Sequence, residues 1–353
     1  MSDSEAPARS PFSHPGDAPG PRHREIRQDR PITPVLTRAG DPAWLITSHE
    51  LAVRALQDGR LFAERFAAPA GPGRNIPAIP ASAHAALAAI HDAGLHKVVM
   101  RAIAPPRARK LRPWVRATAR ARLDALAAGP RPAELSTTYA RALPIAVAGH
   151  VMGIPGDDAA ALGAASLTGL IRLDTGEAGY AAAAARAHDY FRAVLARPRL
   201  PDGIVRRFRE HDAARPPAER VGDDVLAGAC VNVLSAVHDG GLPRVATEDV
   251  EIGGVTIGAG ELVLIGAATA DRDPAAFPGP DRIGADRAGQ GYPVPGRGTH
   301  DRPGGDLGRM VVQVAVEELT RRLPTMRPAV PADEVQWRTD LPGRPPAAIP
   351  VTW

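Results

Sequence analysis

Cysteine is almost absent from this chain of 353 residues, because Cys230 is the only one. A single thiol excludes an intrachain disulfide and any zinc or iron–sulfur site built from several cysteines. Long apolar runs are missing too, since none approaches the ~20 residues needed to span a bilayer. The N-terminus has no apolar core of the kind that marks a secretory signal peptide. We therefore expect a cytoplasmic protein that does not enter a membrane.

Lysine is scarce as well. Lys97 and Lys110 are the only lysines among 43 basic residues, so arginine carries nearly all of the positive charge. With 39 acidic residues the net charge is only +4, although the sequence pI is about 9.7. An excess of four charges is not the concentrated basic surface that binds nucleic acids. We attribute the arginine content to codon usage in a genome rich in G and C, and expect no nucleic-acid partner.

The common catalytic signatures are absent. The sequence contains no G-x-x-x-x-G-K-[ST], no G-x-G-x-x-G that opens a helix, no H-E-x-x-H and no G-x-S-x-G. The 11 histidines are scattered. His91 and His96 are five residues apart, which would place them on different faces of one helix, so we expect no metal pair there. Cys230 lies among apolar neighbours and is expected to be a small buried hydrophobe.

The remaining pattern is mainly helical. Residues 1–22 are rich in Pro, Gly, Ser and Asp without periodicity, and we expect a disordered tail. Residues 23–353 show no linker and no repeat, so we expect a single domain. Apolar residues at three- and four-residue steps predict an amphipathic helix over Pro106–Ala128. Short apolar runs predict a hairpin over residues 32–46 and further strands over 250–265. The expected fold class is mainly α with small β-sheets.

Two later segments carry specific expectations about burial. Val225–Val237 is apolar almost all round, which predicts a helix buried on every side. A helix over Leu307–Leu323 is expected to bury Val312 and Val316 among other apolar residues. The chain is expected to close with a pair of short strands, at residues 335–337 and 349–353.

Several segments after residue 40 match the motifs of one family. These segments are Pro42–Thr47, Ala236–Asp239, Leu242–Glu261, Asp271–Arg282, Gly296–Arg309 and Ile349–Trp353. In them the sequence resembles bacterial cytochrome P-450. Pro42–Thr47 is similar to the first hairpin of that family, and Gly296–Arg309 to its haem-binding loop and the helix that follows. The resemblance covers nearly everything after the tail and implies a P-450-like fold.

The haem-binding loop departs from the family at the position of the iron ligand. The family loop runs roughly F-G-x-G-x-H-x-C-x-G, whereas residues 295–304 read PGRGTHDRPG. Arg302 therefore stands where the resemblance places the ligating cysteine. A guanidinium is permanently charged and offers no lone pair to a metal. We expect no thiolate-ligated haem, no cofactor and no P-450 monooxygenase activity.

Other family features are missing after the oxygen-binding helix. The family continues with A-G-x-[ED]-T-T, whose threonine helps to deliver protons to oxygen, but here His238 and Asp239 are followed by Gly240 and Gly241. Arg244, three residues later, already matches the start of the family's R-x-A-x-E-D strand. The resemblance therefore implies a fold that lacks the helices between the oxygen-binding helix and the E-x-x-R helix, and lacks the E-x-x-R pair itself.

Some positions of the haem pocket survive. Arg244 and His300 match residues that bind haem propionates in the family, and His238 lies in the oxygen-binding segment. His96 matches the histidine of an H-x-x-x-R pair whose arginine is replaced here by Met100. We expect structural or solvent-exposed roles at these vestigial positions, with no catalytic residue and no metal ligand among them. The vestigial positions are His96, His238, Arg244, His300 and Arg302.

One branch of this family is haem-free, lacks the cysteine and activates deoxysugar glycosyltransferases in actinomycete pathways to macrolides and anthracyclines. The resemblance to that branch implies a non-catalytic protein that binds such a glycosyltransferase and stabilises its active form, an auxiliary role in antibiotic biosynthesis. Two alternatives stay open: a degenerate haem protein or monooxygenase with another ligand such as His300, and an interaction protein with a different partner. With the helices deleted, Val225–Val237 either becomes covered by its neighbours or exposes an apolar face to a partner.

Overall fold

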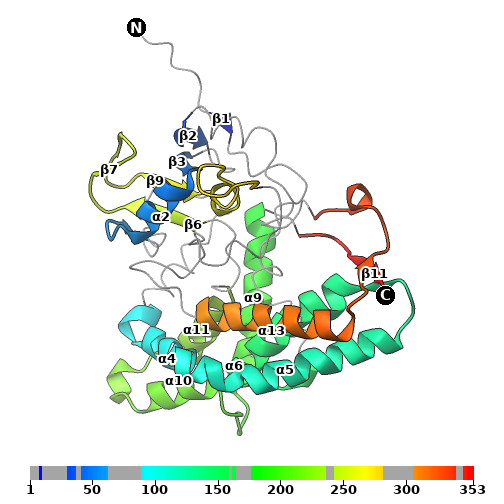
Figure 1. The fold of residues 1–353 in the computed structure, drawn as a ribbon. Coiled ribbons are helices and arrows are strands. Elements are labelled where there is room, and N and C mark those ends of the chain that lie inside the picture. The colour runs from blue at the N-terminus through cyan, green and yellow to red at the C-terminus, as the bar shows by residue number, and fades with distance from the viewer. Residues whose placement is uncertain are drawn as a thin grey trace. The chain divides into compact units, whose positions relative to one another are not determined.

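The computed structural model describes residues 8–9, 30–36, 41–62, 89–158, 161–163, 176–235, 242–280, 305–338 and 345–353. The chain divides into two compact units (Figure 1). Unit 1 combines residues 1–84 with 239–302, and unit 2 combines residues 85–238 with 303–353. Within the predicted tail, Ala8–Arg9 form a two-residue strand, β1, and the rest of residues 1–22 lies outside the described residues. The single domain expected over residues 23–353 stays a prediction.

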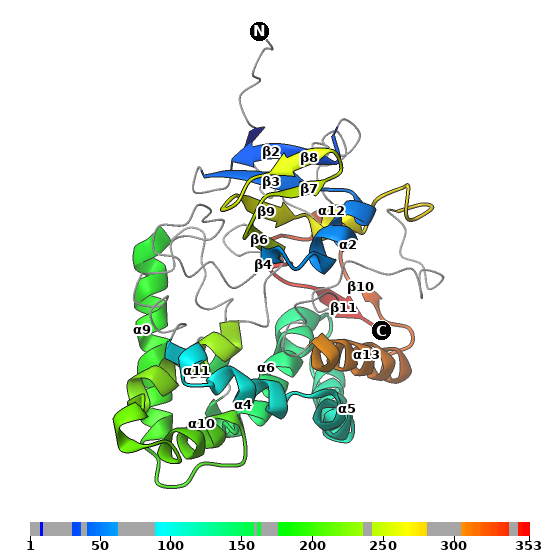
Figure 2. The same cartoon turned by 90° about the vertical axis from the view of Figure 1, so that its left-hand side faces the viewer.

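Unit 1 contains a six-stranded mixed sheet with the strand order β1-β2-β3-β9-β6-β4. The strands after β1 are β2 (Ile32–Leu36), β3 (Pro42–Ile46), β4 (Leu61–Phe62), β6 (Leu242–Ala246) and β9 (Leu262–Ile265). β2 and β3 pair antiparallel, which confirms the predicted hairpin. β3 also pairs in parallel with β9, and β6 pairs antiparallel with β9 and β4. Strands from two distant parts of the sequence therefore lie side by side in one sheet (Figure 2).

A second hairpin is formed by β7 (Val250–Ile252) and β8 (Val255–Ile257), as the sequence predicts. Its two turn residues, Gly253 and Gly254, have positive φ angles of 57° and 78°. A type I′ turn requires positive φ at both central positions, which glycine adopts without a steric penalty. The Gly-Gly pair therefore sets the register of this hairpin.

The large sheet of unit 1 is buried on both faces. Side chains of successive strand residues point to opposite faces. Ile46 and Val263 accordingly belong to one apolar cluster, together with residues of α2 (His49–Gln57), and Leu45 and Leu264 belong to another. All four residues of β9 are buried, which explains why this strand reads as a continuous apolar run.

The helix α2 begins against a carboxylate from a distant part of the sequence. Ser48 occupies the N-cap position, but its side chain makes no capping hydrogen bond. The backbone N–H of His49 instead donates to Asp273 at 2.9 Å, and the same carboxylate accepts the backbone N–H of Ala275 at 3.0 Å. His49 also packs edge-on against Phe277, with 4.8 Å between ring centroids. Asp273 thus joins the start of α2 to the segment that follows α12 (Ala267–Ala270).

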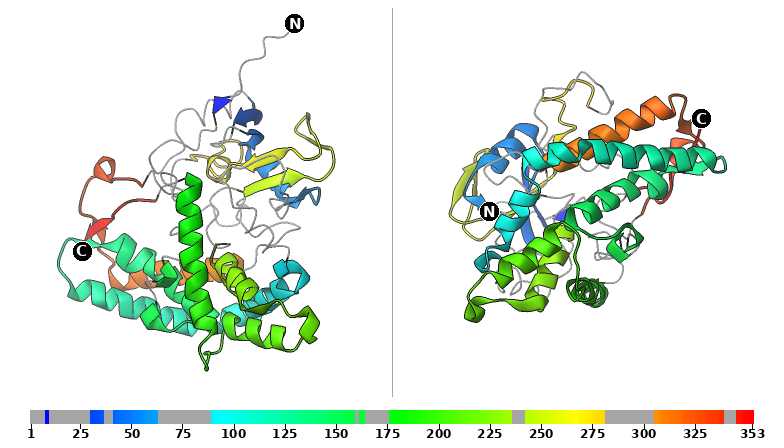
Figure 3. Two further views of the ribbon diagram at one scale, coloured as in Figure 1. Left: turned by 180° about the vertical axis from the view of Figure 1, so that it is seen from behind. Right: turned by 90° about the horizontal axis from the view of Figure 1, so that it is seen from below.

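Unit 2 holds the long helices (Figure 3). They are α4 (Leu95–Ala102), α5 (Pro105–Ala128), α6 (Ala142–Met152), α9 (Gly176–Leu195), α10 (Ile204–Ala213), α11 (Gly222–Ser235) and α13 (Gly305–Arg322). A π-helical turn, Ser136–Ala140, precedes α6. A search of the described helices finds none that is long and apolar enough to cross a membrane.

The helix α5 confirms the amphipathic helix expected over Pro106–Ala128. Pro105 and Pro106 lie at its start, where a missing N–H removes no intrahelical hydrogen bond. Its buried residues form one stripe: Ala108, Val115, Ala119, Leu123 and Leu126. All of these residues except Ala108 belong to the apolar core of unit 2, which α6 and α13 complete.

The helix α13 is rotated relative to the sequence-based expectation. Val312 and Val316, predicted to be buried, are 63% and 53% exposed. The buried face instead carries Val311, Val314 and Glu318. The expectation was wrong because a pattern of apolar residues assigns glutamate to the solvent side, whereas Glu318 points toward α5.

Arginines along α5 pair with two carboxylates of α13. Arg112 and Arg116 contact Glu317 at 3.0 and 2.8 Å, and Arg116 and Arg120 contact Glu318 at 2.9 and 2.7 Å. The three arginines are four residues apart, so they follow one side of α5 turn by turn. We call these five residues the α5–α13 ion row.

Glu318 is the buried member of the α5–α13 ion row. Its side chain is only 3% exposed, and Arg321 adds a further contact at 2.6 Å. The arginines around it are 34% to 59% exposed, so the carboxylate lies beneath arginine side chains close to the surface. The hydrogen bond from Arg120 is the main cause that holds the pKa of Glu318 below its usual value, and desolvation opposes it.

The helix α11 is less completely buried than its composition predicts. Leu226, Ala227, Ala229, Cys230 and Leu234 are buried, whereas the opposite side of the helix is only half-buried. α9 and α10 pack against this helix. No residue from 225 to 234 is exposed, so this part of the predicted partner-binding helix offers no open apolar face.

The closing strand has different partners from those expected. β11 (Pro350–Thr352) pairs antiparallel with β10 (Arg327–Pro328) and with β5 (Ala133–Glu134). The predicted partner segment, 335–337, contributes only an isolated bridge between Trp337 and Pro346 in the described residues. The prolines around this bridge remove the N–H donors that a continuous ladder would need.

We predict that Glu318→Gln lowers the free energy of unfolding by about 1–2 kcal/mol at pH 7, because the arginines lose a charged acceptor but stay partly solvated. Glu317→Gln is the matched control. Because Glu317 is 31% exposed, this substitution should lower the free energy of unfolding by a smaller amount. Denaturant unfolding followed by circular dichroism measures both.

The same contribution should depend on pH. The folded pKa of Glu318 is depressed, so its stabilisation is fully present above the unfolded pKa of glutamate, about 4.3, and is lost as pH falls through the folded value. The difference between the wild-type chain and Glu318→Gln should therefore shrink below about pH 4. A difference that stays constant from pH 7 to pH 3 would contradict the assignment.

Candidate functional site

The vestigial positions fall into two groups. His238, His300 and Arg302 lie outside the described residues. Arg244 and His96 are described, and they belong to unit 1 and unit 2 respectively.

Arg244 is buried within the sheet of unit 1. It lies in β6, opposite Val263 of β9, and is 3% exposed. A buried guanidinium requires compensating polar or charged neighbours, because transfer of an unpaired charge out of water is costly. Arg244 is therefore not solvent-exposed, and its structural role stays a prediction.

His96 lies in the first turn of α4 and packs on another histidine. Its ring stacks on that of His91, with 4.5 Å between centroids and 7° between the ring planes. The expectation that these residues lie apart on one helix was wrong. The helical segment that contains His91 ends before Gly94, and α4 begins one residue after it. The left-handed φ of 72° at Gly94 separates the two helices and changes the direction of the backbone.

The stacked geometry does not suit metal binding. The lone pairs of imidazole lie in the ring planes, so two nearly parallel stacked rings direct them side by side instead of toward one ion. No group of three or more His, Cys, Asp or Glu side chains in the described part of the chain could hold a metal ion. The Nδ1 atom of His96 is buried and has no hydrogen-bond partner within that part.

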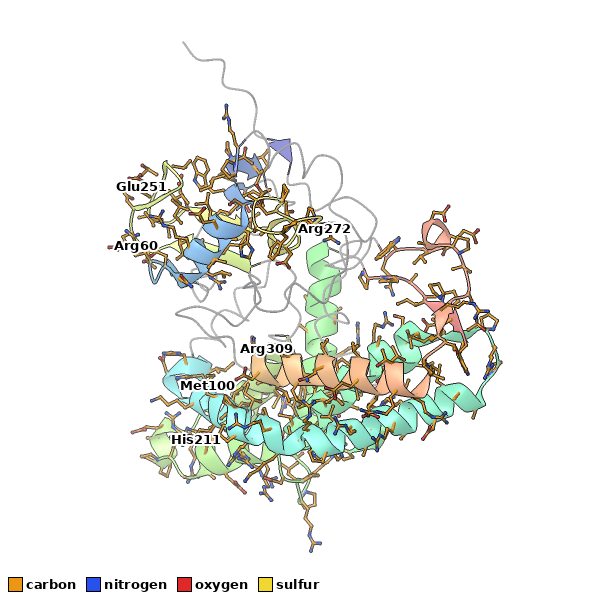
Figure 4. All side chains as sticks on the ribbon, viewed as in Figure 1. Arg60, Met100, His211, Glu251, Arg272 and Arg309 are labelled. Atoms are coloured by element: carbon orange, nitrogen blue, oxygen red, sulfur yellow. The ribbon has the colours of Figure 1, made fainter. Side chains whose placement is uncertain are left out.

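The resemblance pairs His96 with an arginine four residues later, and this chain has a methionine there. Met100 occupies the position of that arginine and is 43% exposed. Arg101, one residue later, is also exposed. Figure 4 labels Met100 on α4 and His211, whose Nε2 lies 2.9 Å from the carbonyl oxygen of Ala93.

Cys230, the only thiol of the chain, is sealed inside unit 2. It lies in α11, has no exposed surface and is surrounded by apolar residues, as the sequence predicts. Burial raises the pKa of its thiol far above the usual value. A thiolate is the form that ligates iron or attacks an electrophile, so Cys230 is unsuited to either role.

The donor chemistry of the chain does not fit the haem of a P-450 fold. Such haem needs a thiolate ligand. Cys230 is a buried, protonated thiol in α11, and the residue where the resemblance places the ligand is Arg302. A guanidinium has no lone pair for iron.

The α5–α13 ion row was not predicted from the sequence, and neither was the pair that Glu318 forms with Arg321. Glu318 and Arg321 do have the E-x-x-R spacing, but this pair lies in α13, after the position of the haem-binding loop. Its carboxylate binds arginines of α5. Arginines at every fourth residue of α5, together with two adjacent glutamates in α13, were the signal that could have revealed the row.

Comparison with known proteins identifies the relatives of this chain. Mycocyclosin synthase of Mycobacterium tuberculosis is 30% identical over 396 aligned positions, which cover 97% of this chain and 98% of the relative. Mycinamicin IV hydroxylase/epoxidase of Micromonospora griseorubida is 27% identical and covers 94% and 95%. No protein-family model matches the chain.

Solved structures agree on the fold. The mixed-function P-450 MycG matches with a TM-score of 0.76 at 28% identity, over 98% of this chain and 100% of that one. The putative thioether synthase SgvP, from the tailoring step of griseoviridin, matches with a TM-score of 0.84 at 23% identity, over 99% and 100%. A mainly helical fold with small sheets of this kind is the cytochrome P-450 fold. The chain belongs to the cytochrome P-450 superfamily, at about 25–30% identity to its bacterial members.

We predict that the single thiol does not react in the native protein. Because Cys230 is fully buried and its pKa is raised, a chromogenic disulfide reagent at pH 8 should label less than a tenth of the chains until denaturant is added. Free cysteine at the same concentration is the control. Rapid stoichiometric labelling without denaturant would show that α11 opens easily.

Proposed function

We propose that this chain is a haem-free, non-catalytic member of the P-450 superfamily that activates or stabilises a nucleotide-deoxysugar glycosyltransferase in natural-product biosynthesis. The observation that carries the proposal is Arg302 at the position of the iron ligand, with Cys230 buried elsewhere. A folded P-450 scaffold without a usable ligand is better suited to binding than to oxygen chemistry.

The short connection between α11 and β6 supports the same proposal. α11 ends at Ser235 and β6 begins at Leu242, so six residues connect them. Two helices cannot fit into six residues, since each helical turn takes 3.6. The alignment with mycocyclosin synthase has 396 positions against 353 residues here, so at least 43 positions have a residue only in the relative. These facts support the deletion of the helices between the oxygen-binding helix and the E-x-x-R helix.

The relatives support the biosynthetic setting. They include the mycinamicin IV hydroxylase/epoxidase and the nocardicin C N-oxygenase, proteins named for their action on natural products. The glycosyltransferase itself comes from the resemblance to the haem-free branch of the family. An activator of this kind needs no catalytic residue, because any protein that binds only the native form of its partner stabilises that form.

We predict that the purified chain contains no haem, even after expression with ample haem precursor, because Arg302 offers no lone pair to iron. Arg302→Cys should not create a monooxygenase, since the ligand alone would return without the deleted helices. Absorption spectroscopy with carbon monoxide and a hydroxylation assay with a redox partner measure both. Stoichiometric haem in the wild-type chain would favour the alternative of a haem protein with another ligand such as His300.

The direct test is glycosyltransferase turnover with and without this chain. The transferase to test is a deoxysugar glycosyltransferase whose gene neighbours that of this chain. Its turnover should rise at least tenfold on co-expression, and it should co-purify with this chain. Alanine variants of His96, His238, His300 and Arg302 should activate as well as the wild-type chain, because none of them has a catalytic task. Loss of activation in stable, folded alanine variants would show that the chain has chemistry of its own and would overturn the proposal.

A further inference from the structure

The first residue of α2 lies at a buried junction within unit 1. His49 donates its backbone N–H to the Oδ2 atom of Asp273 at 2.9 Å, and its ring packs edge-on against Phe277. Asp273 and Phe277 are only 7% and 1% exposed. These contacts join α2 to the segment 271–280. We call His49, Asp273 and Phe277 the α2 junction.

Asp273 supplies the hydrogen bonds on both sides of the α2 junction. Its Oδ1 atom accepts the backbone N–H of Ala275 at 3.0 Å, and its carbonyl oxygen accepts those of Ala276 and Phe277 at 3.1 and 2.8 Å. Its Oδ2 atom takes the place of an N-cap side chain, because Ser48 makes no capping hydrogen bond. The start of α2 and the turn after Asp273 therefore depend on one carboxylate.

The imidazole of His49 lies where a positive charge is unfavourable. Its Nδ1 atom is buried and has no hydrogen-bond partner within the described part of the chain. A neutral imidazole can keep a lone pair there, but an imidazolium carries a proton on both nitrogens and would leave a buried donor unsatisfied. His49 is also the first residue of the helix, where the positive end of the macrodipole repels a cation. The neutral form of His49 therefore fits the α2 junction better than the charged form.

Burial and one nearby charge act on His49 in opposite directions. Desolvation is the larger effect and holds the pKa of His49 below its usual value, and the carboxylate of Asp273 opposes it. α12 with the segment after it, β7 and the strands that share the apolar core of α2 pack against this helix. The charged residues of these elements and of α2 are Glu50, Arg54, Arg244, Glu251, Asp271, Arg272 and Asp273. Among them, Asp273 is the one whose charge acts on the imidazole.

We propose that the α2 junction is a proton-sensitive joint, in which protonation of His49 loosens the attachment of α2 to residues 271–280. The imidazolium is relieved when the start of α2 separates from Phe277 and water reaches the Nδ1 atom. The joint lies within unit 1 and uses none of the vestigial positions. It is independent of the proposed function.

The linkage between protonation and opening sets the direction of the pH dependence. The opened junction binds a proton with the ordinary histidine pKa of about 6.5, whereas the closed junction binds it only at lower pH. The closed form is therefore fully favoured above about pH 6.5, loses stability as the pH falls below that value, and changes no further below the folded pKa. Each pH unit within this window shifts the opening equilibrium by up to about tenfold.

Hydrogen exchange measured by mass spectrometry follows this opening in the full-length chain. Protection of residues 48–54 and 271–280, corrected for intrinsic exchange rates, should fall at least about threefold between about pH 7.5 and about pH 5. Peptides of α5 are the internal control and should keep their protection.

His49→Gln is the decisive variant. Glutamine keeps the backbone N–H that Asp273 binds but has no group that is protonated in this range, so protection of both segments should become independent of pH. His211→Gln is the matched control, because His211 is a half-buried histidine of unit 2 and its replacement should leave the response of the α2 junction unchanged.

Asp273→Asn gives a second test that does not require a folded His49→Gln. Asparagine keeps one acceptor oxygen but removes the charge that favours the imidazolium, so the loss of protection should move to lower pH. A loss at unchanged pH would show that His49 is not the titrating group and would overturn the proposal.

Three other results would also overturn it. Constant protection of both segments in the wild-type chain would show that the closed junction accommodates the imidazolium. An equal loss in folded His49→Gln would assign the response to another group. A loss that includes the control peptides of α5 would show acid unfolding of the chain in place of a local opening.

Discussion

The contact between α5 and α13 determines the surface that unit 2 presents to solvent. These helices come from parts of the chain about 200 residues apart, and an apolar core and the ion row join them. Glu318 turns inward to meet Arg116 and Arg120. Since a helix is rigid along its length, that orientation of Glu318 turns Val312 and Val316 outward. The buried carboxylate and the two exposed valines thus follow from one orientation of α13, which its apolar core residues share.

The elements that could be predicted from the sequence are those in which apolar residues repeat at a regular spacing within one segment. The hairpins at residues 32–46 and 250–257 and the helix α5 follow from local alternation, turn glycines and a three- to four-residue apolar step. The rotation of α13 could not be predicted in this way, because it depends on arginines of another helix. The prediction of the β11 partners failed at β5 for a similar reason, since β5 lies more than 200 residues before β11 in the sequence.

The candidate site shows the same division. Motif resemblance assigned the chain to the cytochrome P-450 superfamily, and this assignment is confirmed. The haem-pocket positions that the resemblance also named stay predictions. Local pattern misjudged His96, because the left-handed conformation of Gly94 interrupts the helix and brings the ring of His91 onto that of His96. Burial of Cys230 was predictable from its apolar neighbours. The hydrogen bonds that lower the pKa of Glu318 were not, since they join two distant helices.

The sheet of unit 1 has a consequence for synthesis of the chain on the ribosome. β3 pairs with β9, and α2 begins against Asp273, yet more than 200 residues separate these partners. At 5–20 residues per second, the first hairpin therefore emerges roughly 10 to 45 s before the strand that completes its sheet. During this interval the edge of β3 has unpaired backbone groups, which is the kind of surface that promotes aggregation. The helices of unit 2 between residues 95 and 235 are synthesised in that interval. Unit 1, although it contains the first residues, therefore finishes folding only after most of unit 2 has been synthesised.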